Sequence, residues 1–307
     1  MKFGVGIIPN NNLNNMIAYA KLAEDAGFEY LWVSDYPNCN IYNILESISR
    51  ETENIKIGPG VTNPYLRNPQ TSAFEIMNIN TSSNNRAVFG IGPGNKDQAE
   101  KLMRSWETPV ADLKKYIHEI SKSFQQEKNQ GIPIYIGAQS PKLLEIAGES
   151  VDGVLINASH PKDYKKLIKH VEKGINNSKR NMNAFDICAY TSTSIGKDLE
   201  SAKNAAKIVV AFTIAGASPP LLERHNINEK ISNEIYFSIS TGNIGGAIGL
   251  ISDELVNKFS ITGTHDEIIQ KIKSLEKTGV TQYIAGPPLG QNMNTSIELL
   301  GDVISSF

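Results

Sequence analysis

Residues 55–65, which read IKIGPGVTNPY, decide how we interpret this chain. Ile55 to Ile57 is typical of a short buried strand, and Gly58-Pro59-Gly60 ends that strand abruptly. Glycines on both sides of a proline let the backbone approach a ligand closely, or let it adopt angles that a side chain would forbid. Taken alone, the stretch is better explained as a tight surface turn.

A second stretch of the same kind changes that interpretation. Residues 87–94 (AVFGIGPG) form another apolar run that ends in glycine and proline. Two strands of one chain that end in Gly-Pro-Gly turns predict a common rim at which a flat molecule binds.

The composition narrows the classes of function. The chain has 307 residues and a net charge of −2, so nothing in its charge favours nucleic acid or an anionic membrane as the partner. Its two cysteines, Cys39 and Cys188, lack the spacing of a disulfide framework or a zinc site. No apolar run approaches the roughly 20 residues of a membrane span, and the N-terminus lacks the apolar core of a signal peptide. We therefore expect a cytoplasmic protein.

Short apolar segments alternate with helical segments along the whole chain. Eight strands are expected, at residues 3–9, 30–34, 55–57, 87–92, 132–137, 153–156, 186–193 and 280–285. This alternation predicts a parallel sheet, and eight units in one domain of residues 1–307 favour a closed (β/α)8 TIM-type barrel over an open doubly wound sheet. Residues 216–264, before the last strand, are an insertion too small to be a domain, and we expect it to cap the barrel or form a subunit contact.

The carboxyl ends of the strands should form the active site of such a barrel. The expected rim is rich in glycine, asparagine, serine and threonine and poor in charge. It contains no HxH or HExxH metal pattern, no GxSxG motif and no GxxxxGK[ST] loop, which argues against metal, serine-hydrolase and nucleoside triphosphate chemistry. A neutral polar rim suits a large flat cofactor whose own chemistry does the work.

Few rim residues stand out as chemical candidates. Asp35 follows the second strand, where an aspartate is also a common turn or cap residue. Residues 92–96 (GPGNK) form either an anion-binding loop aided by Lys96 or a plain loop with a solvated lysine, and we weigh the two equally. His160 precedes a proline and is at least as well explained by a helix entry, and for His225 a charged helix end is the simpler account.

Seven longer motifs then carry a resemblance to a known family. They are residues 55–65 (IKIGPGVTNPY), 86–96 (RAVFGIGPGNK), 132–141 (IPIYIGAQSP), 152–163 (DGVLINASHPKD), 204–212 (NAAKIVVAF), 218–225 (SPPLLERH) and 279–290 (GVTQYIAGPPLG). Together, and over nearly the whole chain, they resemble the archaeal F420-dependent methylenetetrahydromethanopterin reductases of the bacterial-luciferase-like superfamily. The resemblance implies a luciferase-like barrel that assembles as a homodimer or homotetramer. It also implies hydride transfer between coenzyme F420 and the one-carbon unit of tetrahydromethanopterin, a reaction of methanogenesis.

The resemblance also implies roles for particular residues. It places a non-prolyl cis peptide at Gly60-Val61, in a bulge against the cofactor, and makes Asp35 the catalytic candidate. The residues implied to contact the cofactor are Asp35, Gly60, Val61, Thr62, Asn63, Gly92, Gly94, Ala138, Gln139, Ile156, Asn157 and Ala158.

Several positions depart from the family pattern. Gly6 stands where the first strand usually carries an acid, Tyr36 replaces a histidine, and Asn95 replaces an acid. Residues 80–85 replace a more acidic run, and a usual segment is missing, which leaves only residues 125–131 before the fifth strand. The leading hypothesis is the reductase itself, with Asp35 and bound water covering the missing acid. The alternatives are a diverged homologue that acts as a binding or assembly subunit, and an FMN-dependent luciferase-like monooxygenase.

Overall fold

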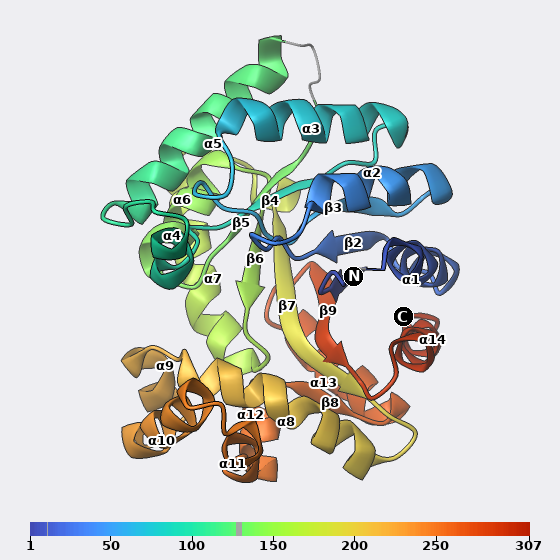
Figure 1. Cartoon of the computed structure of the whole chain (residues 1–307), viewed down its shortest axis with the longest axis vertical. Coiled ribbons are helices and arrows are strands. Elements are labelled where there is room, and N and C mark those ends of the chain that lie inside the picture. The colour runs from blue at the N-terminus through green and yellow to red at the C-terminus, as the bar shows by residue number, and fades with distance from the viewer. Residues whose placement is uncertain (11, 127–130) are drawn as a thin grey trace.

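A parallel barrel with helices around it is the architecture of the chain (Figure 1). The computed structural model describes residues 1–10, 12–126 and 131–307. The shortened segment at residues 125–131 therefore lies mostly outside the described residues. Within them, no helix is both long enough and apolar enough to cross a membrane.

The strands are all parallel, and those of the barrel follow one another around a ring. They are β1 (Lys2–Ile7), β2 (Tyr30–Val33), β3 (Lys56–Pro59), β4 (Phe89–Ile91), β5 (Ile134–Gly137), β6 (Gly153–Asn157), β7 (Asp186–Ile195), β8 (Ile261–Gly263) and β9 (Gln282–Leu289). The sheet order is β3-β2-β1-β9-β7-β6-β5-β4. Backbone bonds from Ile57 N to Arg86 O (3.0 Å) and from Thr62 N to Gly90 O (3.0 Å) join the two ends. The predicted closed barrel is thus confirmed.

The eighth barrel strand is β9, and β8 is an additional strand that pairs with β7. The sequence analysis missed β8 because its three residues merge with the capping box that follows, in which Thr264 and Glu267 bond reciprocally. It also ended the last strand too early, before Pro287 and Pro288. β9 continues through these prolines because its far end pairs with an extended, bulged part of β7, with Ser194 opposite Leu289.

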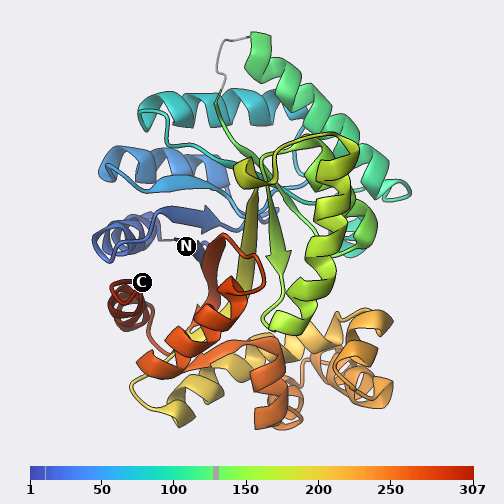
Figure 2. The ribbon, with the colours of Figure 1, turned by 180° about the vertical axis from the view of Figure 1, so that it is seen from behind.

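Helices accompany the barrel strands on its outside, as the view from behind also shows (Figure 2). They are α1 (Leu13–Asp25), α2 (Ile41–Glu51), α3 (Pro69–Ser82), α4 (Lys96–Lys101), α5 (Pro109–Gln126), α6 (Pro141–Ser150), α7 (Pro161–Asn177), α8 (Leu199–Ala215), α13 (His265–Glu276) and α14 (Met293–Ile304). Ser140 caps α6 directly before Pro141, which occupies the first turn of the helix. The first and last segments meet, since the rings of Phe3 and Phe307 lie 5.2 Å apart.

Two hydrophobic layers follow from the alternation of side chains along the strands. One layer lies between strands and helices, and the other fills the barrel. Trp32 is fully buried in the inner layer, with its ring 5.1 Å from that of Tyr135. The inner layer forms a solid floor beneath the carboxyl ends of the strands.

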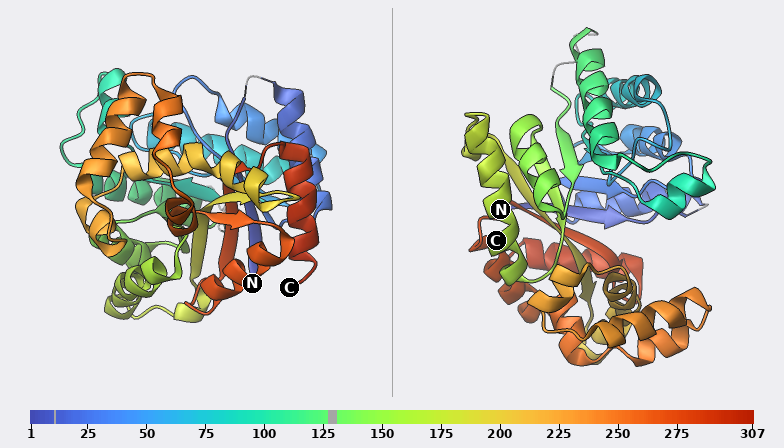
Figure 3. Two further views of the ribbon diagram at one scale, coloured as in Figure 1. Left: turned by 90° about the horizontal axis from the view of Figure 1, so that it is seen from below. Right: turned by 90° about the vertical axis from the view of Figure 1, so that its left-hand side faces the viewer.

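The insertion folds into four short helices beside α8. They are α9 (Pro219–Arg224), α10 (Glu229–Ser240), α11 (Ile244–Gly249) and α12 (Asp253–Phe259), drawn in orange in Figure 3. Their apolar side chains form a separate buried cluster with α8, which includes Val210, Ile235 and Val256. The helices therefore pack on a helix of the barrel rather than directly on its strands.

Candidate active site

The loops that follow β2 to β6 line a cavity of about 980 Å³ at the carboxyl ends of the strands. Most of the predicted cofactor-binding residues line it: Asp35, Gly60, Val61, Thr62, Asn63, Gly92, Gly94, Ala138, Gln139 and Asn157. The structure thus brings together residues that are more than 120 positions apart in the chain.

Two predicted residues do not line this cavity. Ile156 is fully buried in the layer between strands and helices, because neighbouring residues of a strand point to opposite faces and Leu155 takes the inward position. Ala158 lines a smaller adjoining hollow of about 210 Å³ together with Gln139 and Asn157.

The bulge after β3 is the central feature of the cavity wall. The Gly60-Val61 peptide is cis, as the resemblance implied. Gly60 N donates to Val33 O (2.7 Å), and Gly92 N donates to Thr62 O (2.8 Å), so both neighbouring strands hold the bulge.

Glycines on the next two strands make room for the bulge. A Cβ built on Gly90 would lie 3.1 Å from the Val61 side chain, one on Gly92 would lie 3.0 Å from it, and one on Gly137 3.2 Å. These distances are tighter than ordinary van der Waals contacts. The glycine-rich strand ends of the sequence therefore serve a specific purpose, which is to seat Val61 in the wall of the cavity.

Asp35 is placed at the cavity by β2, but its carboxylate is fully buried. Arg67 Nη1 donates to Oδ2 (2.5 Å), and Thr62 Oγ1 donates to the same oxygen (2.7 Å). Burial raises the pKa of Asp35, whereas the bonds from Arg67 and Thr62 oppose that rise. Because a guanidinium does not deprotonate in proteins, we assign the pair as ionised. A buried carboxylate held in this way supports the bulge, and the geometry does not favour it as the proton donor that replaces the missing acid.

Arg67 was not among the predicted residues, yet it pairs with the buried carboxylate of Asp35. It reaches Asp35 from the loop before α3 and lies over the ring of Tyr42, 5.0 Å from its centroid. The bond and charge of Asp35 raise the pKa of Arg67 even though burial acts to lower it. The sequence offers one hint of this role: Arg67 comes directly after the deciding stretch, at NPYLR, and has no acidic residue next to it in the sequence.

The space above Gly6 is filled by Tyr190 of β7. A Cβ on Gly6 would overlap the Tyr190 hydroxyl, and a Cβ on Gly286 would lie 2.7 Å from Cε1 of the same ring. Two glycines, on β1 and β9, thus leave room for the Tyr190 ring to cross the barrel. Burial raises the pKa of Tyr190, so it is a neutral phenol. The departure at Gly6 is therefore part of a local packing arrangement.

The GPGNK loop behaves as a plain loop. Asn95 caps α4 by accepting from Gln98 N (2.8 Å). Lys96 lines the cavity, but its ammonium lies 3.6 Å from Glu100 on an exposed helix turn. Trp106 also lines the cavity, and its Nε1 donates to Pro93 O (3.3 Å), which fastens the loop.

The histidines near the insertion are structural. His160 caps α7 by accepting from Lys162 N (3.1 Å), as predicted for a helix entry. His225 lies at the end of α9, next to Arg224, as expected for a charged helix end, and it is buried there, where Asp163 accepts from its Nε2 (2.9 Å). In the residues that the structure describes, no cluster of three or more potential ligands could hold a metal ion.

A TIM barrel with a large neutral cavity, walled by a glycine-seated bulge, is the architecture of a cofactor-dependent enzyme. A family model described as luciferase-like monooxygenase matches residues 1–282, and the chain belongs to this family. The 5,10-methylenetetrahydromethanopterin reductase of Archaeoglobus fulgidus is 42% identical and aligns with 99% of this chain and 98% of that protein. The chain thus belongs with the methylenetetrahydromethanopterin reductases.

Solved structures agree with this assignment. The coenzyme F420-dependent tetrahydromethanopterin reductase of Methanopyrus kandleri superposes with a TM-score of 0.94 at 35% identity, over 100% of this chain and 99% of that one. An F420-dependent secondary alcohol dehydrogenase, at 15% identity and a TM-score of 0.79, shares the fold.

Proposed function

We propose that this chain is a cytoplasmic oxidoreductase that transfers a hydride from reduced coenzyme F420 to methylene-tetrahydromethanopterin and so yields methyl-tetrahydromethanopterin. The observation that carries the proposal is the full-length similarity to reductases that are named for this substrate. The cavity of this chain also contains the bulge at Val61 and the glycines that surround it.

The cavity residues fit a flat deazaflavin. Close contacts of Gly90, Gly92 and Gly137 with Val61 leave the wall smooth, since a methyl group on any of them would disturb the bulge. Gln139 Nε2 donates to the backbone carbonyl of Asn157 (2.8 Å), which fixes the neutral Gln139 side chain at the cavity. When bound, the deazaflavin supplies the hydride.

The protein contributes position and exclusion of water. Val61 supports one face of the ring, and the Asp35–Arg67 pair holds Val61 in place through Thr62. Gly60, Asn63, Gly94 and Ala138 complete the wall around it. Trp106 covers the side formed by the loop after β4. Under this proposal Asp35 is a positioning residue, and its carboxylate neither donates nor accepts a proton in the reaction.

We further propose that residues 1–307 form one domain and that the chain assembles as a homodimer or homotetramer. Exposed aromatic side chains support an assembly: Phe74 on α3 is 61% exposed, and Phe237 on α10 is 66% exposed. Light scattering coupled to size-exclusion chromatography tests the assembly, and a monomer would contradict it.

A fluorescence titration with oxidised F420, run beside FMN, tests the cofactor. We expect saturable binding of F420 and no binding of FMN, followed by F420-dependent reduction of the methylene-pterin in a coupled assay. Binding of FMN alone would favour the luciferase-like monooxygenase. Binding of F420 without turnover would favour a diverged binding subunit.

A further inference from the structure

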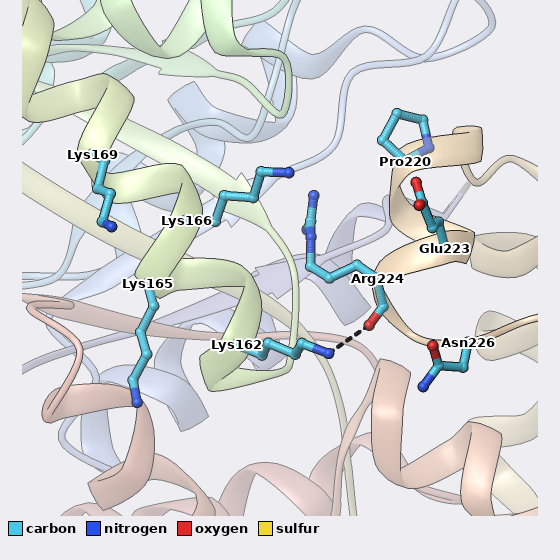
Figure 4. Close-up of a pocket in the computed structure, with 8 residues that line it drawn as sticks. All are labelled: Lys162, Lys165, Lys166, Lys169, Pro220, Glu223, Arg224 and Asn226. Atoms are coloured by element: carbon cyan, nitrogen blue, oxygen red, sulfur yellow. Dashed lines mark hydrogen bonds between the residues drawn. The ribbon is translucent and has the colours of Figure 1, made fainter.

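A groove lined by cations lies on the outside of the barrel, between α7 and α9 (Figure 4). Its volume is about 610 Å³, and it shares no lining residue with the cavity described above. Its charged residues are Lys162, Lys165, Lys166, Lys169, Glu223 and Arg224. Even if Asp163 is counted with Glu223, five cations face two carboxylates, in a chain whose net charge is −2.

The lysines of α7 are arranged against the usual preferences of a helix. Lys162 and Lys166 are four residues apart, as are Lys165 and Lys169, and like charges at this spacing destabilise a helix. Lys162 also lies in the first turn, where the helix dipole disfavours a cation. In the part of the chain that the structure describes, Lys165, Lys166 and Lys169 have no ion-pair partner. An arrangement that helix stability disfavours calls for another source of stabilisation.

The facing wall holds a cation in a fixed position. Arg224 Nη1 donates to the buried Asp163 (2.5 Å), which also accepts from His225. Arg224 Nε is buried and has no hydrogen-bond partner among the described residues. Lys162 Nζ donates to the carbonyl of Arg224 (2.7 Å) and ties the two walls together. Figure 4 shows Lys162 and Lys166 pointing from α7 toward α9, whereas Lys165 and Lys169 line the same groove but do not reach toward α9.

We propose that this groove binds a small polyanion, a ligand with at least two phosphate or carboxylate groups. One group sits between Lys166 and Arg224, whose like charges an anion brings together. The four lysines span eight residues of α7, from Lys162 to Lys169, or about 10 Å of helix, so a ligand with several anionic groups uses them better than a single anion. The site is separate from the cavity and does not depend on the proposed reaction.

Isothermal titration calorimetry of the full chain tests this site with pyrophosphate and tricarballylate as probes. The variant is Lys165→Gln/Lys166→Gln, because both side chains are exposed and glutamine keeps the helix propensity. The matched control is Lys114→Gln/Lys122→Gln, which makes the same charge change on exposed positions of α5. Arg224 is left intact because its pair with Asp163 supports the fold.

We expect at least one probe to bind the natural chain, with a dissociation constant that rises at least tenfold in the groove variant and less than twofold in the control. Tighter binding of pyrophosphate would assign the ligand as a phosphate ester, and tighter binding of tricarballylate would assign it as a polycarboxylate. No binding of either probe, or equal weakening in both variants, would overturn the proposal.

Discussion

Two neighbouring regions of the barrel are built in different ways. The cavity wall at β3, β4 and β5 is made of backbone and glycine, with Val61 seated on Gly90, Gly92 and Gly137. The region at β1, β2 and β7 is held by long side chains: Tyr190 lies above Gly6, and Arg67 reaches Asp35. The glycines of the first region form a local pattern that can be recognised in the sequence. The side-chain contacts of the second region join residues far apart in the chain and leave no such pattern.

Removing Arg67 tests the side-chain construction and has the largest expected effect. In Arg67→Gln the fully buried Asp35 carboxylate loses its countercharge, which costs about 3–5 kcal/mol of unfolding free energy. The pKa of Asp35 rises further in this variant, so the folded state binds more protons than the unfolded state and stability falls as the pH rises.

Urea denaturation at pH 5 and pH 8 measures this, and we expect the deficit of the variant to be larger at pH 8. Arg50→Gln is the control, because Arg50 forms an exposed pair with Glu46 within one helix. If Arg67→Gln were as stable as this control, Asp35 would not be an ionised buried group.

A methyl group on Gly60 tests the backbone construction. In Gly60→Ala the new Cβ would lie 2.6 Å from Trp32 Cβ, so the bulge must shift away from the fully buried tryptophan. We expect binding of F420 to weaken about 100-fold, or about 2.7 kcal/mol, in a fluorescence titration. Gly245→Ala is the control, since its Cβ would meet no atom within 4 Å. Unchanged F420 affinity in Gly60→Ala would remove the bulge from the proposed binding site.

Placing an acid at Gly6 tests whether the two glycines and Tyr190 form one unit. The carboxylate of Gly6→Glu has no space while Tyr190 is present, so the variant should lose about 1–3 kcal/mol of stability, as overpacked cores do. The double variant Gly6→Glu/Tyr190→Ala should recover part of that loss. A double-mutant cycle of unfolding free energies measures the coupling, and additive effects would show that the positions are independent.

This comparison also explains which features were predictable. The barrel followed from the periodicity of short apolar strands, whereas the cis peptide, the bulge and most of the cavity wall were implied by the family resemblance that the short motifs carry. Arg67 and Tyr190 could not be predicted in their roles, because a contact between residues 32 or 184 positions apart is set by the register of the closed sheet. The burial of His225 was missed for the same reason, since its partner Asp163 lies on another helix.

The contact of α7 with α9 offers a last and smaller test of the side-chain construction. Burial and the neighbouring His225 lower the pKa of His160, so the unfolded state binds a proton more readily than the folded state. Stability should therefore fall as the pH drops below 6.5. His160→Asn keeps a capping acceptor but does not titrate, so its melting temperature should fall less than that of the natural chain between pH 7.5 and pH 5.5, by about 1–2 °C.

His118→Asn on α5 is the control, because His118 is exposed and far from this contact in the chain. Differential scanning calorimetry at both pH values decides the question: parallel pH dependence in the natural chain and His160→Asn would mean that the cap of α7 is open to solvent.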